Sequence, residues 1–252
     1  MRVLFIGDIY MDKGMEALRK YLPEIKKVYK PNIIICNGEN SADGNGLTKE
    51  VYKELMSLGI GAITLGNHTF SKREIKEIID LPNIARPANY GPGVIGNKTI
   101  TIKYNQEKVT IINLLGRVFM RDYVESPFTV IDEILKDVSS DYIIVDIHAE
   151  ATSEKYALAN YLDGRVSALV GTHTHVPTAD NIVFPKGMLY ISDIGMTGIK
   201  YGIIGGEIKQ GIYKFISGVP ENVRPENHGP LQFNAVLLDL TNKKIEKINI
   251  FE

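Results

Sequence analysis

The sequence predicts an α/β fold in which a core of two β-sheets carries helices on its outside. Three observations predict it. Short, almost continuous apolar runs alternate with helix-like stretches, the pattern of strands buried in a parallel or mixed sheet. Two pairs of apolar runs are separated by only a few polar residues, which indicates β-hairpins. Finally, neither a repeat nor a separating linker divides the chain, so we expect one domain over residues 1–252.

In the amino-terminal part of the chain, three strands alternate with three helices. Each strand is a short run of apolar, largely β-branched residues. The helices are indicated by apolar residues on one side, by Thr48 as an amino-terminal cap of the second, and by Ser71 before the third. The predicted strands are Val3–Ile6, Asn32–Cys36 and Ala62–Leu65, and the predicted helices are Glu16–Tyr29, Thr48–Ser57 and Lys72–Ile79.

The rest of the chain continues this alternation and adds the two hairpins. Strands Tyr142–Ile147, Ala168–Val170 and Leu189–Ile191 are apolar almost throughout, and the helix Ser153–Leu162 lies between the first two. The polar pair Asn105-Gln106 and the polar triplet Thr241-Asn242-Lys243 are expected at the hairpin turns. The hairpin strands are Thr99–Lys103 with Val109–Leu114, and Leu231–Leu240 with Lys244–Ile250.

Composition excludes several classes of protein. Of 252 residues, 44% are apolar and 23% charged, so the chain can bury a core and is not disordered. The net charge of −1 gives no strong nucleic-acid signature. The single cysteine, Cys36, cannot form an intrachain disulfide. Apolar runs fall short of the roughly 20 residues that span a bilayer, so we expect a cytoplasmic protein without membrane contact.

Polar side chains follow five of the apolar runs, at the points where the predicted strands end. Because ligand sites of open α/β sheets lie beyond the carboxyl ends of strands, we expect these groups to converge. Imidazole, carboxylate and amide oxygen are all metal ligands, and the absence of a thiolate favours manganese or iron, with zinc as an alternative. The predicted ligands are Asp8, Glu39, Asn40, Asn67, His148, His173 and His175.

Seven ligands are too many for one four-coordinate ion and suit two ions about 3.5–4 Å apart. Glu39, from the middle of the set, could bridge them. A hydroxide held between the two ions would attack phosphorus. His68 is left over beside Asn67, and we expect it to stabilise the transition state and protonate the leaving oxygen.

Each of these groups alone also has a plain structural explanation. Asp8 could serve only as a turn residue or a helix cap, Glu39 could belong to an ordinary loop, and His148 could be a hydrogen-bonded histidine at a strand end. The joint pattern favours a metal site, because chance would have to place every group directly after an apolar run.

The predicted ligands lie in short motifs, and further characteristic stretches lie between them. The ligand motifs are Gly7-Asp8, Gly38-Glu39-Asn40, Gly66-Asn67-His68, His148 and Gly171-Thr172-His173-Thr174-His175. The further stretches are Arg86-Pro87-Ala88-Asn89, Gly116-Arg117-Val118-Phe119, His148-Ala149-Glu150-Ala151-Thr152-Ser153-Glu154-Lys155 and Asp193-Ile194-Gly195-Met196-Thr197-Gly198. In these motifs the sequence resembles the calcineurin-like metallophosphoesterases, and within them the bacterial YmdB-type subfamily, over most of residues 1–220.

The resemblance implies a four-layer αββα sandwich, two mixed sheets flanked by helices, with a dinuclear iron or manganese centre. It implies hydrolysis of small cyclic nucleotides, 2′,3′-cyclic ones above all, with His68 as the catalytic histidine. One ion would take Asp8, Glu39, Asn40 and His175, and the other Glu39, Asn67, His148 and His173. From the residues alone, Asn89, Arg117 and Glu150 could line the substrate pocket, although Arg117 could equally make a structural ion pair.

Three residues depart from the usual superfamily or subfamily pattern. Tyr10 stands where many members have a further histidine ligand, and Glu39 stands where they have aspartate. Both changes agree with the YmdB-type subfamily. Met11 stands where that subfamily usually has glycine, which leaves the shape of this rim open.

Other functions and roles stay open at this point. A phosphomonoesterase such as a nucleotidase could use the same centre, and so could a regulatory, RNA-linked protein with weak turnover. A homo-oligomer is compatible with the sequence. Asp146 and Asp193 either orient the ligands from behind or serve ordinary packing and capping.

Overall fold

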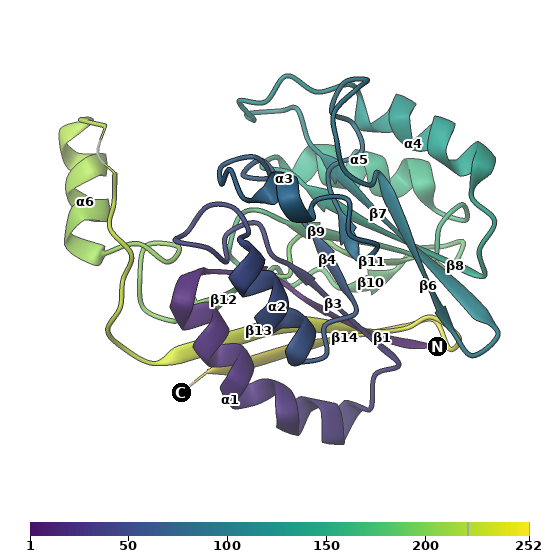
Figure 1. Ribbon diagram of the computed structural model, residues 1–252, viewed down its shortest axis with the longest axis horizontal. Coiled ribbons are helices and arrows are strands. Elements are labelled where there is room, and N and C mark those ends of the chain that lie inside the picture. Colours follow the sequence, from purple (N-terminus) through teal and green to yellow (C-terminus); the bar gives the residue numbers. More distant parts are fainter. Residues whose placement is uncertain (221, 252) are drawn as a thin grey trace.

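The computed structural model describes residues 1–220 and 222–251, and its centre is a pair of mixed β-sheets (Figure 1). The first sheet has eight strands. Its neighbours β1, β3, β4 and β5 run parallel, whereas β13 runs antiparallel to β1, β12 and β14. The strands of this sheet are β1 (Arg2–Ile6), β2 (Asp8–Ile9), β3 (Ile33–Asn37), β4 (Ala62–Thr64), β5 (Ile84–Ala85), β12 (Met196–Ile199), β13 (Leu231–Asp239) and β14 (Lys244–Phe251).

The second sheet has six strands, and its four central strands are parallel. Because they are parallel, β7, β8 and β9 deliver their carboxyl ends to one edge. The outer strands β6 and β10 are antiparallel to their neighbours. The strands of this sheet are β10 (Ile182–Val183), β11 (Leu189–Ile191), β9 (Ala168–Thr172), β8 (Tyr142–His148), β7 (Glu107–Leu115) and β6 (Thr99–Tyr104).

Three apolar clusters hold the layers together. Phe5 of the first sheet and Ile144 of the second belong to one buried cluster, so the sheets pack face to face. Leu18 joins a second cluster between the first sheet and its helices, and Leu158 joins a third between the second sheet and its helices. The order is therefore helix, sheet, sheet, helix, and the expected two mixed sheets flanked by helices are present.

Six helices are present among the described residues. None of them combines the length and the apolar character that a transmembrane span needs. Helices α1, α2 and α3 contribute to the cluster on the first sheet, and α4 and α5 to the cluster on the second. The helices are α1 (Met11–Tyr29), α2 (Lys49–Ser57), α3 (Ile75–Ile78), α4 (Pro127–Asp137), α5 (Thr152–Leu162) and α6 (Ile208–Ser217).

Several local predictions are confirmed. Thr48 caps α2, and its hydroxyl oxygen accepts a hydrogen bond from the Val51 amide at 3.4 Å. Both hairpins form. Asn105 turns the first one in the left-handed region at φ 54°, which asparagine tolerates well.

The third predicted helix, Lys72–Ile79, is confirmed only over α3. Residues 71–74 form bends and turns instead, held by the following contacts. The Lys72 amine pairs with Asp43 at 2.7 Å, and the Ser71 amide donates to the His68 carbonyl at 3.0 Å. Helix α1 begins at Met11 rather than Glu16.

Helices α4 and α6 are absent from the sequence-based prediction. The sequence does contain an indication of α4, because Pro127 occupies the first turn of this helix, a position where proline is favoured. Helix α6 stands away from the body of the molecule (Figure 1). Its Phe215 and Ile216 side chains are 81% and 79% exposed, so tertiary packing does not account for it.

Candidate metal centre

All seven side chains predicted as ligands lie together where the carboxyl ends of the two sheets meet. The first sheet supplies those that follow β1, β3 and β4, and the second sheet supplies those at the ends of β8 and β9. The contributing residues are Asp8, Glu39, Asn40 and Asn67 from the first sheet, and His148, His173 and His175 from the second.

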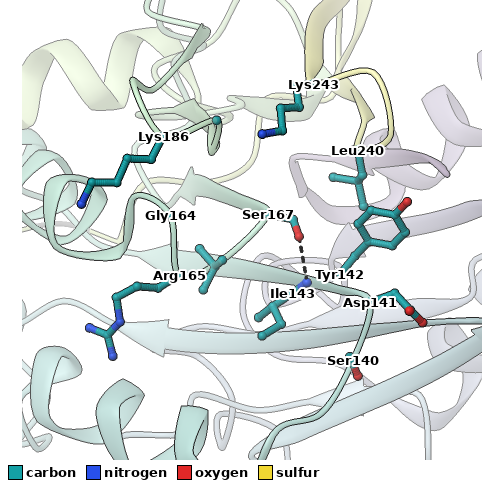
Figure 2. Close-up of a pocket in the computed structure, with 12 residues that line it drawn as sticks. Ser140, Asp141, Tyr142, Ile143, Gly164, Arg165, Ser167, Lys186, Leu240 and Lys243 are labelled. Atoms are coloured by element: carbon teal, nitrogen blue, oxygen red, sulfur yellow. Dashed lines mark hydrogen bonds between the residues drawn. The ribbon is translucent and has the colours of Figure 1, made fainter.

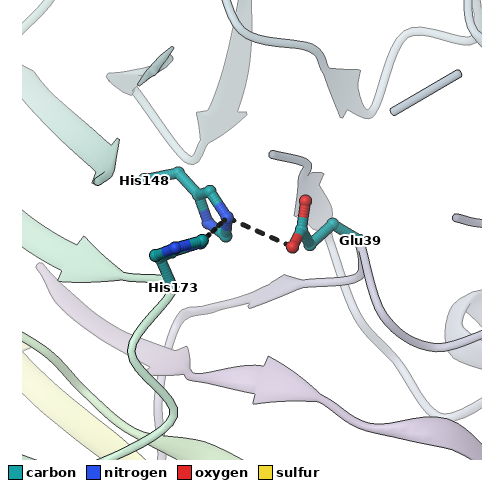
Figure 3. A group of neighbouring side chains, drawn as sticks. All are labelled: Glu39, His148 and His173. Atoms are coloured by element: carbon teal, nitrogen blue, oxygen red, sulfur yellow. Dashed lines mark hydrogen bonds and ion pairs between the residues drawn. The ribbon is translucent and has the colours of Figure 1, made fainter. Parts of the chain in front are cut away.

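His148 is the centre of one half of this cluster (Figure 3). Its Nε2 lies 3.1 Å from Glu39 Oε1, 3.0 Å from Asn67 Oδ1 and 3.0 Å from His173 Nδ1. Ligand atoms of Glu39, His148 and His173 all lie within 4.8 Å of one another. One N–H can serve only one of three acceptors, so a single proton cannot satisfy this arrangement.

The partners of the other ring nitrogens identify which atoms face inward. Thr172 gives its hydroxyl hydrogen to Asp146 Oδ1 at 2.8 Å, so it accepts from His148 Nδ1 at 2.9 Å. His173 Nε2 lies 3.0 Å from a Glu150 carboxylate oxygen, which makes Nε2 the donor and Nδ1 the acceptor. When His148 and His173 are neutral, their lone pairs therefore meet those of Glu39 and Asn67, the donor set of a cation site.

The second half of the cluster surrounds Asp8. Its Oδ1 is buried and has no hydrogen-bond partner among residues 1–220 and 222–251. His175 Nε2 lies 4.0 Å from this oxygen and 3.2 Å from the Asn40 amide nitrogen. His175 Nδ1 donates to the Ile204 carbonyl at 3.0 Å, which leaves Nε2 as a lone pair facing inward. A buried carboxylate oxygen without a donor fits a cation.

Burial and mutual charge set the ionisation of these groups. Burial raises the pKa of Asp8 to about 6, against the opposing charges of His175 and His148. Burial also disfavours ionised Glu39, but the charge and hydrogen bond of His148 lower its pKa to about 2. Burial would lower the pKa of His148, yet Glu39, Asp8 and Asp146 raise it to about 9. In the absence of a cation, His148 and Glu39 therefore form a buried ion pair.

The loop that carries His173 and His175 is strained and is held from behind. Both residues have positive φ, at 102° and 68°, a region unusual for residues other than glycine. Asp193 accepts the Thr174 amide at 3.0 Å and pairs with the Lys155 amine at 2.9 Å. The same amine donates to the Thr172 carbonyl at 2.9 Å. The fully buried Lys155 thus fixes the start of this ligand loop and the carboxylate that holds its middle.

Gly66 leaves room for the centre. A Cβ at this position would collide with the Glu39 carboxylate and lie 2.5 Å from His148 Nε2. Any side chain here would displace two of the predicted ligands.

His68 lies beside the ligands without being one of the converging groups. Its backbone amide donates to Glu39 Oε2 at 2.9 Å, and its ring lines a cavity of about 360 Å³ together with Glu39, His173 and His175.

The three residues predicted to contact substrate lie in different places. Glu150 lines the cavity next to His173. Arg117 lies on the rim of a neighbouring cavity. Asn89 does not reach either one, because its buried amide donates to the Leu115 and Glu125 carbonyls, both at 2.9 Å. Asn89 braces a loop, and here the structure differs from the prediction.

Two of the three residues that depart from the family pattern, Tyr10 and Met11, make local contacts beside the centre. Tyr10 lines the cavity and packs edge-on against the His175 ring, with centroids 5.4 Å apart. Met11 has a φ of 57°, the region in which glycine carries no steric cost. Its amide donates to the Asn40 carbonyl at 3.0 Å, which ties this rim to the centre.

Sequence reasoning missed the groups behind the ligands. Asn37 and Thr64 are buried and donate to Asp146 Oδ2 at 3.2 Å and 2.6 Å. Asp146 and Asp193, for which two roles were open, both support ligand-bearing segments. Polar residues inside otherwise apolar runs were the available signal.

A different cavity of about 320 Å³ lies at the amino ends of β8 and β9 (Figure 2). Ser167 and Tyr142 line it, and Arg165 and Lys186 extend away from Ser167. It contains none of the predicted site residues.

Comparison with known protein families shows the family to which this chain belongs. Residues 4–251 match the family described as YmdB-like protein. The chain belongs to this family. A YmdB-like relative from Bacillus subtilis (strain 168), a 2′,3′-cyclic-nucleotide 2′-phosphodiesterase, is 44% identical over 258 residues, which is 99% of this chain and 97% of the relative.

Two solved structures are similar in fold to this chain over its whole length. A hypothetical protein from Thermus thermophilus has a TM-score of 0.95 and 40% identity, with all of both chains covered. A novel phosphatase from Mycoplasma pneumoniae has a TM-score of 0.92 and 35% identity, covering 100% of this chain and 94% of that one.

Proposed function

We propose that this YmdB-like chain is a metal-dependent phosphodiesterase that hydrolyses small cyclic nucleotides, with 2′,3′-cyclic nucleotides favoured. The observation that carries the proposal is the group of lone pairs around His148 Nε2, which one proton cannot satisfy. The activity named for the Bacillus subtilis relative supports the choice of substrate. In this proposal the fold is of the calcineurin-like metallophosphoesterase type.

Two cations, iron or manganese, are proposed for the centre. Asp8, Glu39, Asn40 and His175 would hold one, and Glu39, Asn67, His148 and His173 the other. When bound, such cations neutralise phosphate charge and lower the pKa of water from about 15.7 to about 7, which supplies a nucleophile at neutral pH.

The residues of the chain account for the remaining steps. A water oxygen loses a proton to solvent and forms a new bond to phosphorus, the P–O2′ bond breaks, and O2′ takes a proton from His68, which solvent then reprotonates. The products are a 3′-phosphate and a free 2′-hydroxyl. Thr172 and Glu150 orient the rings of His148 and His173, so that both present their inward nitrogens throughout.

The test is hydrolysis by purified chain loaded in turn with Mn²⁺, Fe²⁺ and Zn²⁺. We expect 2′,3′-cyclic AMP to be hydrolysed faster than 3′,5′-cyclic AMP and faster than 3′-AMP, with Asn67→Ala as the inactive control. Faster release of phosphate from the monoester would favour a phosphomonoesterase instead. Equal rates for wild type and Asn67→Ala with every metal would refute the proposal.

Cation binding is expected to release protons. His148, whose pKa is about 9, must lose its proton to become a ligand, so at pH 7.5 about one proton should leave per active site. Release should rise as the pH falls through about 6, where Asp8 also becomes protonated.

Calorimetric titration of metal-free protein with Mn²⁺ in buffers of different ionisation enthalpy measures this release. The exposed His228 serves as the control, and His228→Ala should leave the proton count unchanged. A binding enthalpy independent of the buffer would contradict the assignment of His148 as a ligand.

A further inference from the structure

We propose that a second cavity beside the centre binds the nucleotide that precedes the cyclic phosphate. The preferred substrates are then short oligoribonucleotides that end in a 2′,3′-cyclic phosphate, rather than cyclic mononucleotides. The inference rests on the proposed function, since the scissile phosphate must lie at the centre.

The cavity has a volume of about 720 Å³ and is formed by the segment that follows β7, with Gly91 on its other side. Arg117, Arg121 and Tyr123 line it. This volume is typical of a binding site for a small organic ligand, and it is larger than a phosphate group alone would need.

Three contacts place this cavity next to the centre. The amide of Gly116, directly before Arg117, donates to the His148 carbonyl at 3.0 Å. Tyr90, directly before Gly91, places its hydroxyl 3.5 Å from the Gly66 carbonyl. The Asp122 carboxyl, which lines the cavity, is near enough to His68 to respond to its charge. One substrate can therefore reach both cavities.

The loop is fixed at both ends, so the cavity exists before a ligand arrives. The buried Glu154 carboxylate accepts the amides of Arg117 at 3.0 Å and Val118 at 3.1 Å. At the other end, the Glu125 amide donates to the Asn89 carbonyl at 2.8 Å, and the Asn89 side chain returns a bond to Glu125. A preformed loop loses little conformational entropy on binding.

The charged groups of the cavity include both signs. Within residues 1–220 and 222–251, neither Arg117 nor Arg121 forms an ion pair with a carboxylate. Asp122 and Glu125 line the same cavity, but the two arginine residues are exposed and their guanidinium groups are available. A guanidinium binds phosphate oxygens in a planar, bidentate manner, so an internucleotide phosphate fits this side.

Aromatic side chains accompany these arginines. Tyr123 is fully exposed, and Phe119 on the same loop is 85% exposed with a φ of 62°. Exposed aromatic rings beside unpaired arginines are the means by which proteins bind single-stranded nucleic acid, through stacking of bases and contacts to phosphate. In the described part of the chain neither ring joins a buried apolar cluster, so both rings are available for base stacking.

The experiment compares kcat/KM for four substrates of the Mn²⁺-loaded protein: a cyclic mononucleotide, its 5′-phosphorylated form, and a dinucleotide and a trinucleotide that end in a cyclic phosphate. We expect the dinucleotide to exceed the mononucleotide by about 10-fold or more, since stacking and phosphate contacts each contribute on this scale. A gain from the 5′-phosphate alone would overturn the base-binding role and assign the cavity to a terminal phosphate, whereas a gain only with the dinucleotide would support the internucleotide phosphate and the base.

Variants then test the residues. Arg121→Ala and Tyr123→Ala should reduce the ratio of dinucleotide to mononucleotide kcat/KM towards one, and Arg121→Lys should restore part of it. The matched controls Arg224→Ala and Tyr213→Ala, both close to or within α6, should keep the wild-type ratio.

These measurements separate binding at the second cavity from hydrolysis at the centre. Hydrolysis of the mononucleotide with a wild-type ratio of one, or a ratio unchanged in Arg121→Ala, overturns the second cavity alone. If no substrate is hydrolysed, the proposed function fails. Fluorescence anisotropy of a labelled trinucleotide with a cyclic-phosphate end then decides the cavity, because Arg121→Ala must weaken binding and Arg224→Ala must not.

Discussion

Replacing His68 by alanine is expected to lower kcat for 2′,3′-cyclic AMP by about 10²–10⁴-fold, the usual contribution of a general acid. The cation content should stay unchanged, because the His68 ring is not among the converging lone pairs and its link to Glu39 is through the backbone amide, which alanine keeps. Steady-state kinetics measures kcat, and elemental analysis measures the cation content of the variant.

The leaving group provides a sharper test of the same role. p-Nitrophenolate leaves without a proton, so His68→Ala should lose far less activity on bis(p-nitrophenyl) phosphate than on 2′,3′-cyclic AMP. The exposed His228→Ala is the control and should match wild type on both. An equal loss on both substrates would contradict proton donation and would indicate a role in binding phosphate.

Replacing Lys155 by methionine is expected to lower the free energy of unfolding by about 3–5 kcal/mol, the cost of leaving one partner of a buried ion pair uncompensated. Lys155 is fully buried and Asp193 is 1% exposed, so solvent cannot take over the lost contact. Urea unfolding of the metal-free protein measures the change. The exposed Lys209→Met should stay within about 0.5 kcal/mol of wild type.

A double-variant cycle tests whether the pair itself is responsible. Lys155→Met combined with Asp193→Asn should lose clearly less than the sum of the two single variants, because neither buried charge remains. Additive losses would show that the two residues stabilise the protein independently.

The sequence predicts the strands of this protein and the convergence of polar side chains at their ends better than its surface. Asp8, Glu39 and His148 were identifiable because each follows an apolar run, and parallel strands necessarily bring such ends together. Helix α4 carries a proline signal in its first turn, whereas α6 lacks the packing from which most helical stability derives.

Contacts between distant parts of the chain could not be predicted in the same way. Lys155 and Asp193 are 38 residues apart, and no local pattern shows that they meet. Asn89 was predicted to line the substrate pocket, yet its side chain braces the loop that ends at Glu125. The loop residue Asp122 lies near His68 only because two separate strand ends converge.

The predicted ligands are divided between two sheets, so the candidate centre also depends on how the sheets pack together. Asp8 and Glu39 come from one sheet and His148 and His173 from the other, so only a chain whose sheets have docked in register presents a complete site. In the proposed function, cation binding adds its free energy to that docking. Removal of the metal would then lower the stability of the protein as well as its activity, so occupancy of the proposed centre would also report whether the two sheets had packed correctly.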